Sequence, residues 1–109
     1  MQKLQVLWTK SAESDLELIV EYLKNDSLDR AKKIFFEIKE ACGTLNSNPG
    51  RGRTVPELQQ IGVAEYKELI HKRWRVIYKA GSTKVYILLV VDSNRNLEDV
   101  LFQRLLGKK

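Results

Sequence analysis

The fold of this 109-residue chain is decided by three strand-like runs: EYKELI at 65–70, WRVIYK at 74–79 and VYILLVV at 85–91. Polar joints of a few residues separate the runs, and joints this short predict antiparallel hairpins. The third run is apolar at nearly every position, which predicts a central strand buried on both faces. Because cations interrupt the first two runs, we expect half-exposed neighbours that carry positive charge to one open surface of the sheet.

Apolar spacing in the first half predicts a strand followed by two helices. Residues 4–8 alternate as in a strand, and apolar residues then recur at helical spacing over 16–23 and over 31–45. The connector between the helices is short, which predicts an antiparallel hairpin. Hydroxyl side chains that can cap the helices precede each one: Thr9 or Ser11 before the first and Ser27 before the second.

The remaining segments complete the prediction of an α+β fold. The stretch NSNPG at 46–50 should end the second helix, and residues 51–62 read as a loop that is extended before Pro56. Apolar spacing from Leu97 predicts a short C-terminal helix. The predicted order is therefore β-α-α-β-β-β-α, with the helical hairpin packed on one face of a mostly antiparallel twisted sheet. We expect the other face to stay partly open and residues 1–109 to form a single domain.

Composition excludes several classes of protein. With 43% hydrophobic and 30% charged residues, the chain has the balance of a folded protein. No apolar run approaches the roughly 18 to 20 residues that cross a bilayer, so we expect a cytoplasmic protein without a membrane partner. Cys42 and His71 are the sole residues of their types, which excludes an intramolecular disulfide and predicts neither a metal site nor a cofactor.

Positive charge is concentrated in the second half of the chain. Residues 1–50 carry 7 Lys and Arg against 8 Asp and Glu, whereas residues 51–109 carry 12 against 6, and the whole chain has a net charge of +5. Such a field favours a polyanion or an acidic protein as partner and speeds their encounter, without identifying which. We therefore expect the functional surface on the sheet half.

Four segments behind the helical hairpin form an ordered set: GRTVPEL at 52–58, EYKEL at 65–69, WRVIYK at 74–79 followed by VYIL at 85–88, and RNLEDVL at 95–101. Together they resemble the RelE/ParE superfamily of toxins from toxin–antitoxin modules, some of which act in plasmid stabilisation. The resemblance implies growth inhibition by a toxin that a small antitoxin with an acidic segment neutralises in a hetero-oligomer. RelE-like members are ribosome-dependent endoribonucleases that cut mRNA, whereas ParE-like members act on DNA gyrase.

The resemblance also implies which cations contact the target or a phosphate group. Arg75 matches the strand arginine that contacts phosphate in RelE-like enzymes, Lys67 matches a lysine of the preceding strand, and Arg95 lies near a third basic position. We add Arg73 to this predicted target surface. If the chain is an RNase, Arg75, Lys67 and Arg95 are its predicted catalytic cations, placed around the phosphate.

The groups for proton transfer match RelE-like enzymes less well. RNA cleavage needs a base for the 2′-OH and an acid for the leaving oxygen. RelE-like members tend to place a tyrosine or a His–Tyr pair near the C-terminus, where this chain has FQR at 102–104. Where a second strand lysine is expected, the chain has Glu68 or Leu69. These departures favour the ParE-like branch over a RelE-like endoribonuclease.

Simpler interpretations stand beside these roles. Arg75 could pair with Glu68 or Glu65 across neighbouring strands. Glu57 could be a general base or the partner of a nearby arginine, and His71 could be a proton shuttle or an ordinary surface residue. A further alternative for the whole chain is a small adaptor protein that keeps the fold without toxicity.

Two kinds of antitoxin contact are expected. Arg51 and Arg53 flank a glycine in the predicted loop, where mobile cations can engage an acidic segment. On the helical hairpin, an apolar groove can accept an antitoxin helix, with Leu16, Leu23 and Phe36 as the predicted contacts.

Overall fold

The computed structural model describes residues 3–106, with side chains described for residues 3–104. Within that range no helix combines the length and the apolar content needed to cross a membrane. The elements, in chain order, are β1 (Gln5–Trp8), α1 (Lys10–Lys24), α2 (Leu28–Gly43), the 3₁₀ turn η1 (Thr44–Asn46), β2 (Arg53–Thr54), α3 (Pro56–Gln59), β3 (Tyr66–His71), β4 (Trp74–Ala80), β5 (Lys84–Asp92) and α4 (Leu97–Leu106).

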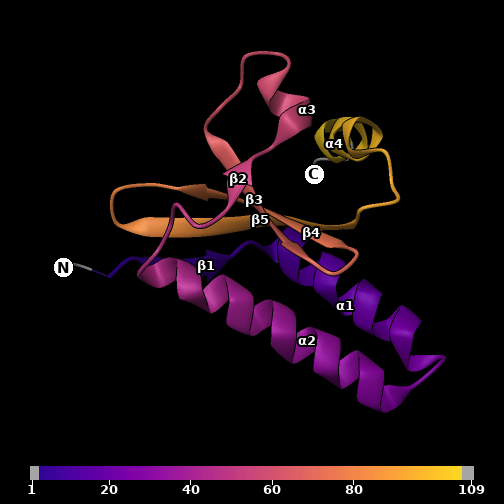
Figure 1. Cartoon of the computed structure of the whole chain (residues 1–109). Coiled ribbons are helices and arrows are strands. Elements are labelled where there is room, and N and C mark those ends of the chain that lie inside the picture. Colours follow the sequence, from indigo (N-terminus) through magenta and orange to yellow (C-terminus); the bar gives the residue numbers. More distant parts are fainter. Residues whose placement is uncertain (1–2, 107–109) are drawn as a thin grey trace.

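Helices α1 and α2 begin where hydroxyl side chains cap them. Thr9 Oγ1 accepts a hydrogen bond from the Ala12 N–H at 3.2 Å, and Ser27 Oγ accepts one from the Arg30 N–H at 3.1 Å. These bonds satisfy backbone donors that the first turn of a helix leaves unpaired. The two helices fold back on each other as the predicted hairpin and lie along one face of the sheet (Figure 1).

The five strands form one sheet in the order β1-β5-β4-β3-β2. Neighbouring strands are antiparallel except β1, which runs parallel to β5 with Gln5 opposite Lys84. The predicted α+β class, with a helical hairpin on a mostly antiparallel sheet and a short C-terminal helix, is confirmed.

The main core lies between the helical hairpin and the sheet. Ile38 of α2, Leu45 of η1 and Tyr78 of β4 have no exposed surface there. Burial of a side chain of this size stabilises the fold by about 1.5 to 3 kcal/mol. This core explains why the apolar stripes of both helices face the sheet. We call it the first core, and its buried members are Ala12, Leu16, Leu23, Ala31, Ile34, Ile38, Cys42, Leu45, Leu69, Trp74, Val76, Tyr78, Val85, Ile87 and Val90.

A second core lies on the opposite face of the sheet. The expectation that this face stays partly open is wrong at its centre, because α4 and the residues before α3 cover its apolar side chains (Figure 1). Arg104 of α4 also donates from Nη2 to both carboxylate oxygens of Asp15 in α1, at 2.8 Å each. The second core consists of Val55, Ile77, Leu89, Val91, Leu97 and Val100.

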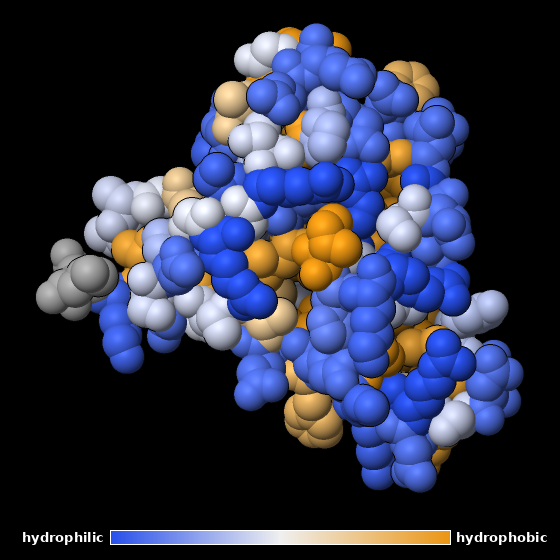
Figure 2. All heavy atoms as spheres, viewed as in Figure 1, coloured by the Kyte–Doolittle hydropathy of each residue, from blue (hydrophilic) through white to orange (hydrophobic). Residues whose placement is uncertain are grey.

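Some large apolar side chains lie outside both cores and are exposed on the surface. Figure 2 shows hydrophobic atoms among hydrophilic ones near the middle of the view, where the strands lie in Figure 1. Several large apolar side chains keep half or more of their surface exposed: Leu18, Tyr22, Leu28, Phe36, Ile61, Ile70 and Phe102. Single exposed apolar side chains are ordinary on protein surfaces, whereas those that border a hollow can indicate a binding site.

A β-bulge in β5 changes the faces on which the side chains of this strand lie. Ile77 pairs with Leu89 while Tyr78 pairs with Ile87, so Leu88 is an extra residue in the ladder. Ile87 therefore joins the first core and Leu89 the second. The prediction of a strand buried on both faces is confirmed for the second half of β5, whereas its first half alternates between buried and exposed residues.

Residues 51–62, predicted as a loop, contain β2 and the single turn of α3. Val55 is extended, with φ −71° and ψ 115°, as expected before a proline. Pro56 then begins α3, a position where its missing N–H costs no hydrogen bond. The segment is therefore more ordered than its composition indicates.

Gly52 brings this segment into direct contact with the sheet. A Cβ at Gly52 would lie 2.5 Å from the Glu68 carbonyl oxygen and 2.7 Å from the Tyr78 hydroxyl. That hydroxyl accepts a hydrogen bond from the Gly52 N–H at 2.9 Å and donates one to the Pro49 carbonyl at 2.7 Å. Only glycine permits this approach without a shift of the backbone.

Candidate functional site

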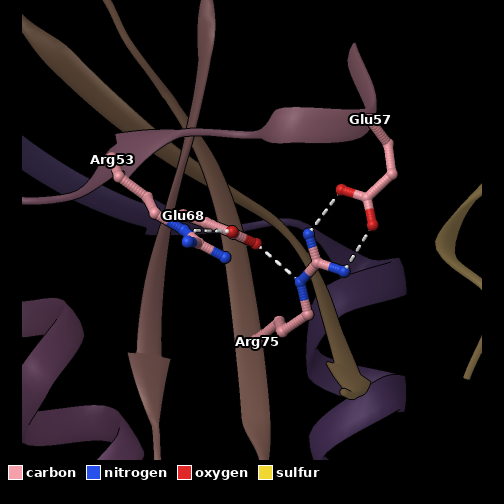
Figure 3. Close-up of polar contacts among 4 residues, drawn as sticks. All are labelled: Arg53, Glu57, Glu68 and Arg75. Carbon is pink, nitrogen blue, oxygen red and sulfur yellow. Dashed lines mark hydrogen bonds and ion pairs between the residues drawn. The ribbon is translucent and has the colours of Figure 1, made fainter. Parts of the chain in front are cut away.

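Four charged side chains from four elements meet on the α4 side of the sheet (Figure 3). Arg75 of β4 donates from Nη1 and Nη2 to the carboxylate of Glu57 in α3, at 2.9 and 2.7 Å. Arg75 Nε donates to Glu68 Oε1 of β3 at 2.7 Å, and Arg53 Nε of β2 donates to Glu68 Oε2 at 2.7 Å. We call these four residues the Arg75 cluster.

Burial explains why the Arg75 cluster is so fully paired. The Glu68 side chain has no exposed surface, and the Arg75 side chain is 9% exposed. A buried carboxylate is costly unless cations neutralise it. Hydrogen bonds from Arg75 lower the pKa of Glu57, and those same bonds, with the one to Glu68, raise the pKa of Arg75. Glu57 and Arg75 therefore both stay charged at neutral pH.

The simpler interpretation of Arg75, a pair with Glu68, is confirmed. Each of the three guanidinium nitrogens of Arg75 donates to a carboxylate, so a phosphate that approaches Arg75 meets the negative charges of Glu57 and Glu68. Glu65, the other partner considered, lies 3.6 Å from Lys79 instead. The partner of Glu57 is likewise an arginine. The cluster holds the segment around α3 against the sheet.

Lys67 lies on the opposite face of the sheet from Arg75. In the β3–β4 ladder Lys67 pairs with Tyr78 of the first core, whereas Arg75 shares its face with Ile77 of the second core. Successive side chains of a strand alternate between the faces, which separates the two cations. The expectation that Lys67 and Arg75 share one basic surface is therefore wrong.

Arg73 and Arg95 come together at the end of the sheet, around Asp92. Arg73 Nε donates to Asp92 Oδ2 at 3.1 Å, and Arg73 Cζ lies 4.8 Å from the centroid of the Trp74 ring. The Arg95 N–H donates to the Asp92 carbonyl at 2.9 Å. Hydrogen bonds from Arg73 and from the backbone of Asn94, with the charge of Arg95 nearby, hold the pKa of Asp92 below its ordinary value.

His71 is placed away from the Arg75 cluster. His71 Nε2 lies 2.7 Å from Glu37 Oε1 in α2, and Lys72 Nζ lies 3.2 Å from the same oxygen. These contacts lower the pKa of Glu37. Because His71 pairs with Trp74 of the first core, its side chain leaves the sheet on the face opposite to Arg75. The two residues do not face a common substrate.

Neither thiol nor metal chemistry is favoured by the described residues. Burial raises the pKa of Cys42 to about 12, so the thiol packs as a small apolar group. Among residues 3–104, no three side chains of His, Cys, Asp or Glu gather as metal ligands would.

The predicted antitoxin contacts divide into buried and exposed residues. Leu16 and Leu23 are wrong as surface contacts, because they are 1% and 2% exposed and pack in the first core. Phe36 is 65% exposed on α2. Arg51 donates hydrogen bonds to the C-terminal end of α2 and to η1, whereas the Arg53 side chain is 59% exposed at the edge of the Arg75 cluster.

An apolar hollow of about 450 Å³ lies between α3, α4 and the sheet, and sequence reasoning missed it. The spacing of Leu58 and Ile61 after Pro56 is the signal that could have indicated an apolar helical face there. Glu57 links its rim to the Arg75 cluster. We call it the α3–α4 hollow, and its apolar walls are Leu58, Ile61, Tyr66, Ile77, Leu88, Leu89, Leu101 and Phe102.

The family of the chain follows from a comparison with known proteins. A family model described as the ParE toxin of the type II toxin–antitoxin system, parDE, matches residues 6–97. The chain therefore belongs to the ParE toxin family, within the RelE/ParE superfamily, and is the toxin component of a type II toxin–antitoxin system. A comparison with curated protein sequences gives no significant match.

Solved structures of other proteins share the fold. A chain of the chromosomal ParDE system from P. aeruginosa has a TM-score of 0.67 at 19% identity, and the match covers 83% of this chain and 96% of that chain. A chain of the RelBE2 toxin–antitoxin complex from Mycobacterium tuberculosis has a TM-score of 0.61 at 21% identity, covering 83% and 98%. The YoeB dimer from Staphylococcus aureus has a TM-score of 0.54 at 17% identity, covering 80% and 93%.

Proposed function

We propose that this toxin inhibits growth in the cytoplasm by binding DNA gyrase, and that a cognate antitoxin neutralises it in a hetero-oligomer. The observation that carries the proposal is the pairing of Arg75. The strand arginine that an RNase of this superfamily would use is bound to Glu57 and Glu68. A toxin arranged in this way acts through its outer surface, without cutting RNA.

The other requirements of RNA cleavage support the same choice. An RNase needs a base, an acid and cations around one phosphate. The lowered pKa of Glu57 makes it a weak base, and its oxygens are occupied by Arg75. His71 and Lys67 lie on the hairpin side of the sheet, away from Arg75. The match to the ParE family is in keeping with a gyrase target.

We assign the target contact to the end of the sheet around Arg73 and Arg95. The Arg73 side chain is 44% exposed, and Arg95 is exposed in the turn after β5. A hollow of about 410 Å³, lined by Leu18, Trp74 and Arg95 among others, lies beside them. Cations beside apolar surface are suited to a protein interface, where arginine and tryptophan often dominate the binding energy.

Purified toxin, gyrase and a relaxed plasmid test the target directly. The expected result is loss of supercoiling, while mRNA on translating ribosomes stays intact in a parallel reaction. Arg95→Glu should weaken the inhibition, whereas Lys84→Glu, the same charge change at the start of β5, should leave it unchanged. Cleaved mRNA with undiminished supercoiling would overturn the proposal in favour of a RelE-like endoribonuclease.

The α3–α4 hollow is the surface that we assign to the antitoxin. Ile61 and Phe102, at its rim, are 71% and 59% exposed, as expected for residues that await an apolar partner. Growth on induction, with and without the antitoxin encoded beside the toxin, provides the assay. Ile61→Asp with Phe102→Asp should abolish rescue by the antitoxin but keep toxicity. Loss of rescue in Phe36→Asp instead would place the antitoxin on the helical hairpin.

A further inference from the structure

A second charged surface lies between α2 and the turn that joins β3 to β4. Here a groove of about 370 Å³ runs between cations from two elements. Arg30 and Lys33 belong to α2, whereas Lys72 and Arg73 belong to the turn, and Ile34 and Trp74 lie at its base. We call it the basic groove. It is on the hairpin side, away from the α3–α4 hollow.

Two of the four cations in the basic groove have no carboxylate partner. Lys72 Nζ lies 3.2 Å from Glu37, and Arg73 is paired with Asp92. Across residues 3–104, neither Arg30 nor Lys33 has a carboxylate oxygen within 4.0 Å. The groove therefore keeps an uncompensated positive charge.

The position of Arg30 opposes the stability of α2. Arg30 lies in the first turn, where the helix dipole disfavours cations, and Lys33, three residues later, adds a like charge beside it. A residue choice that conflicts with local stability is often explained by function. Binding of an anionic group by Arg30 and Lys33 would account for the conflict.

The other wall of the groove is held by a tight hairpin turn. Lys72 has φ 56°, the only positive φ of a non-glycine residue between residues 3 and 106. The two-residue turn between the paired residues His71 and Trp74 requires this conformation, which fixes where Lys72 leaves the backbone. Arg73 is held in place on the same turn by Asp92 and by the ring of Trp74. The turn thus presents two cations opposite those of α2.

We propose that the basic groove binds an acidic segment of a partner protein. Carboxylates of the segment pair with Arg30 and Lys33, and an apolar side chain between them contacts Ile34 and Trp74. Charge complementarity favours an anion, and the apolar base favours a peptide over a nucleic acid. A phosphate backbone, with its closely spaced charges, gains most from a continuous row of cations, which Glu37 and Asp92 interrupt here.

Fluorescence anisotropy with the full-length toxin tests this proposal. The probe is a labelled synthetic peptide in which glutamates flank a central leucine. Arg30→Glu with Lys33→Glu should weaken binding about tenfold or more, with a steep dependence on salt. Lys10→Glu with Lys32→Glu is the matched control, because it makes the same charge change on α1 and α2 outside the groove, and it should bind nearly as the parent does.

Thermal melting separates binding from folding. Arg30→Glu places an anion in the first turn of α2, which the helix dipole favours, whereas Lys33→Glu places one four residues from Asp29 and from Glu37. Because these small effects oppose each other, the double variant should melt close to the parent protein. A peptide with serine in place of leucine should bind more weakly if the apolar base takes part. The proposal is overturned if the parent does not bind the peptide, or if both charge variants bind equally. Tighter binding of a single-stranded oligonucleotide, lost in the Arg30 and Lys33 variant, would assign the groove to nucleic acid.

Discussion

Glu68 bears a charge on a side chain without exposed surface, and its two oxygens accept hydrogen bonds from Arg53 and Arg75. Removing a carboxylate from water costs several kcal/mol, which only paired cations offset. Arg75 is the more deeply buried of the two arginines and also holds Glu57. One guanidinium group therefore joins β3, β4 and α3.

Arg75→Ala should lower the free energy of unfolding by about 3 kcal/mol, because it leaves the buried Glu68 carboxylate short of a cation. Urea denaturation followed by circular dichroism measures the change. Arg73→Ala, which removes an exposed pair with Asp92, should cost much less. If Arg75→Ala and Arg73→Ala lost equal free energy of unfolding, the expectation that the buried ion pair contributes more than the exposed one would be wrong. Because the Arg75→Ala protein is less stable, any loss of toxicity must be compared with the fraction of that protein that is folded.

Glu57→Gln should make the stability of the folded protein depend less on pH in the acid range. The lowered pKa of Glu57 means that the unfolded chain binds its proton more readily, so the stabilisation is complete above the ordinary value of 4.5 and is lost as the pH falls toward the lowered pKa. Melting temperatures at about pH 6 and about pH 3 should differ less in Glu57→Gln than in the parent. An unchanged difference would show that Glu57 does not contribute to acid unfolding.

At the scale of elements, the segment from Gly52 to Glu57 depends on close contact with the sheet. Its backbone touches Glu68 and the Tyr78 hydroxyl, and its charged end joins the Arg75 cluster. This contact places α3 beside α4 and so forms one wall of the α3–α4 hollow.

Gly52→Ala should destabilise the fold by about 2 kcal/mol, because the added methyl group forces the Tyr78 ring or the backbone of β3 to shift. Gly50→Ala is the control, since a Cβ there meets nothing within 4 Å. Thermal unfolding of both variants gives the comparison. In addition, Gly52→Ala should weaken antitoxin binding if the hollow is the antitoxin surface. A Gly52→Ala protein as stable as Gly50→Ala would contradict the close approach.

The elements with a long apolar stripe could be predicted from the sequence, whereas α3 could not. Helices α1 and α2 each bury one stripe of regularly spaced residues, and the three long strands are runs of strand-forming residues between short polar joints. A single turn such as α3 has no period of its own, and Pro56 looks the same in a loop and at a helix start.

The faces of the sheet on which the cations lie depend on register, which composition does not reveal. His71 pairs with Trp74, so a turn of two residues sets Lys67 and Arg75 on opposite faces. A shift of one residue in this pairing would move every side chain of a strand to the other face. The basic character of the second half was readable from the sequence, but the partners of Arg75 were not.

For the whole molecule, one sheet carries a core on each face. The first core is the larger, and the second is closed by α4. Because β4 and β5 contribute to both, loss of either core should disturb the strands that support the other. The two faces should therefore unfold together.

Ile38→Ala in the first core and Leu97→Ala in the second should each lower stability by about 3 kcal/mol and keep a single transition. Circular dichroism and tryptophan fluorescence should give the same urea midpoint within each variant. Phe102→Ala, at an exposed position of α4, should change the midpoint little. Separate transitions for the two probes in Leu97→Ala would show that α4 unfolds independently of the sheet.

The parallel pairing of β1 with β5 delays the completion of the sheet while the chain is being synthesised. Thr9, at the end of β1, donates its hydroxyl hydrogen to the Ile87 carbonyl, 78 residues further along the chain. During synthesis β1 must therefore stay without its partner strand until β5 has been made. A nascent chain released before β5 lacks the strand that joins β1 to the rest of the sheet, so it cannot reach the fold of the toxin.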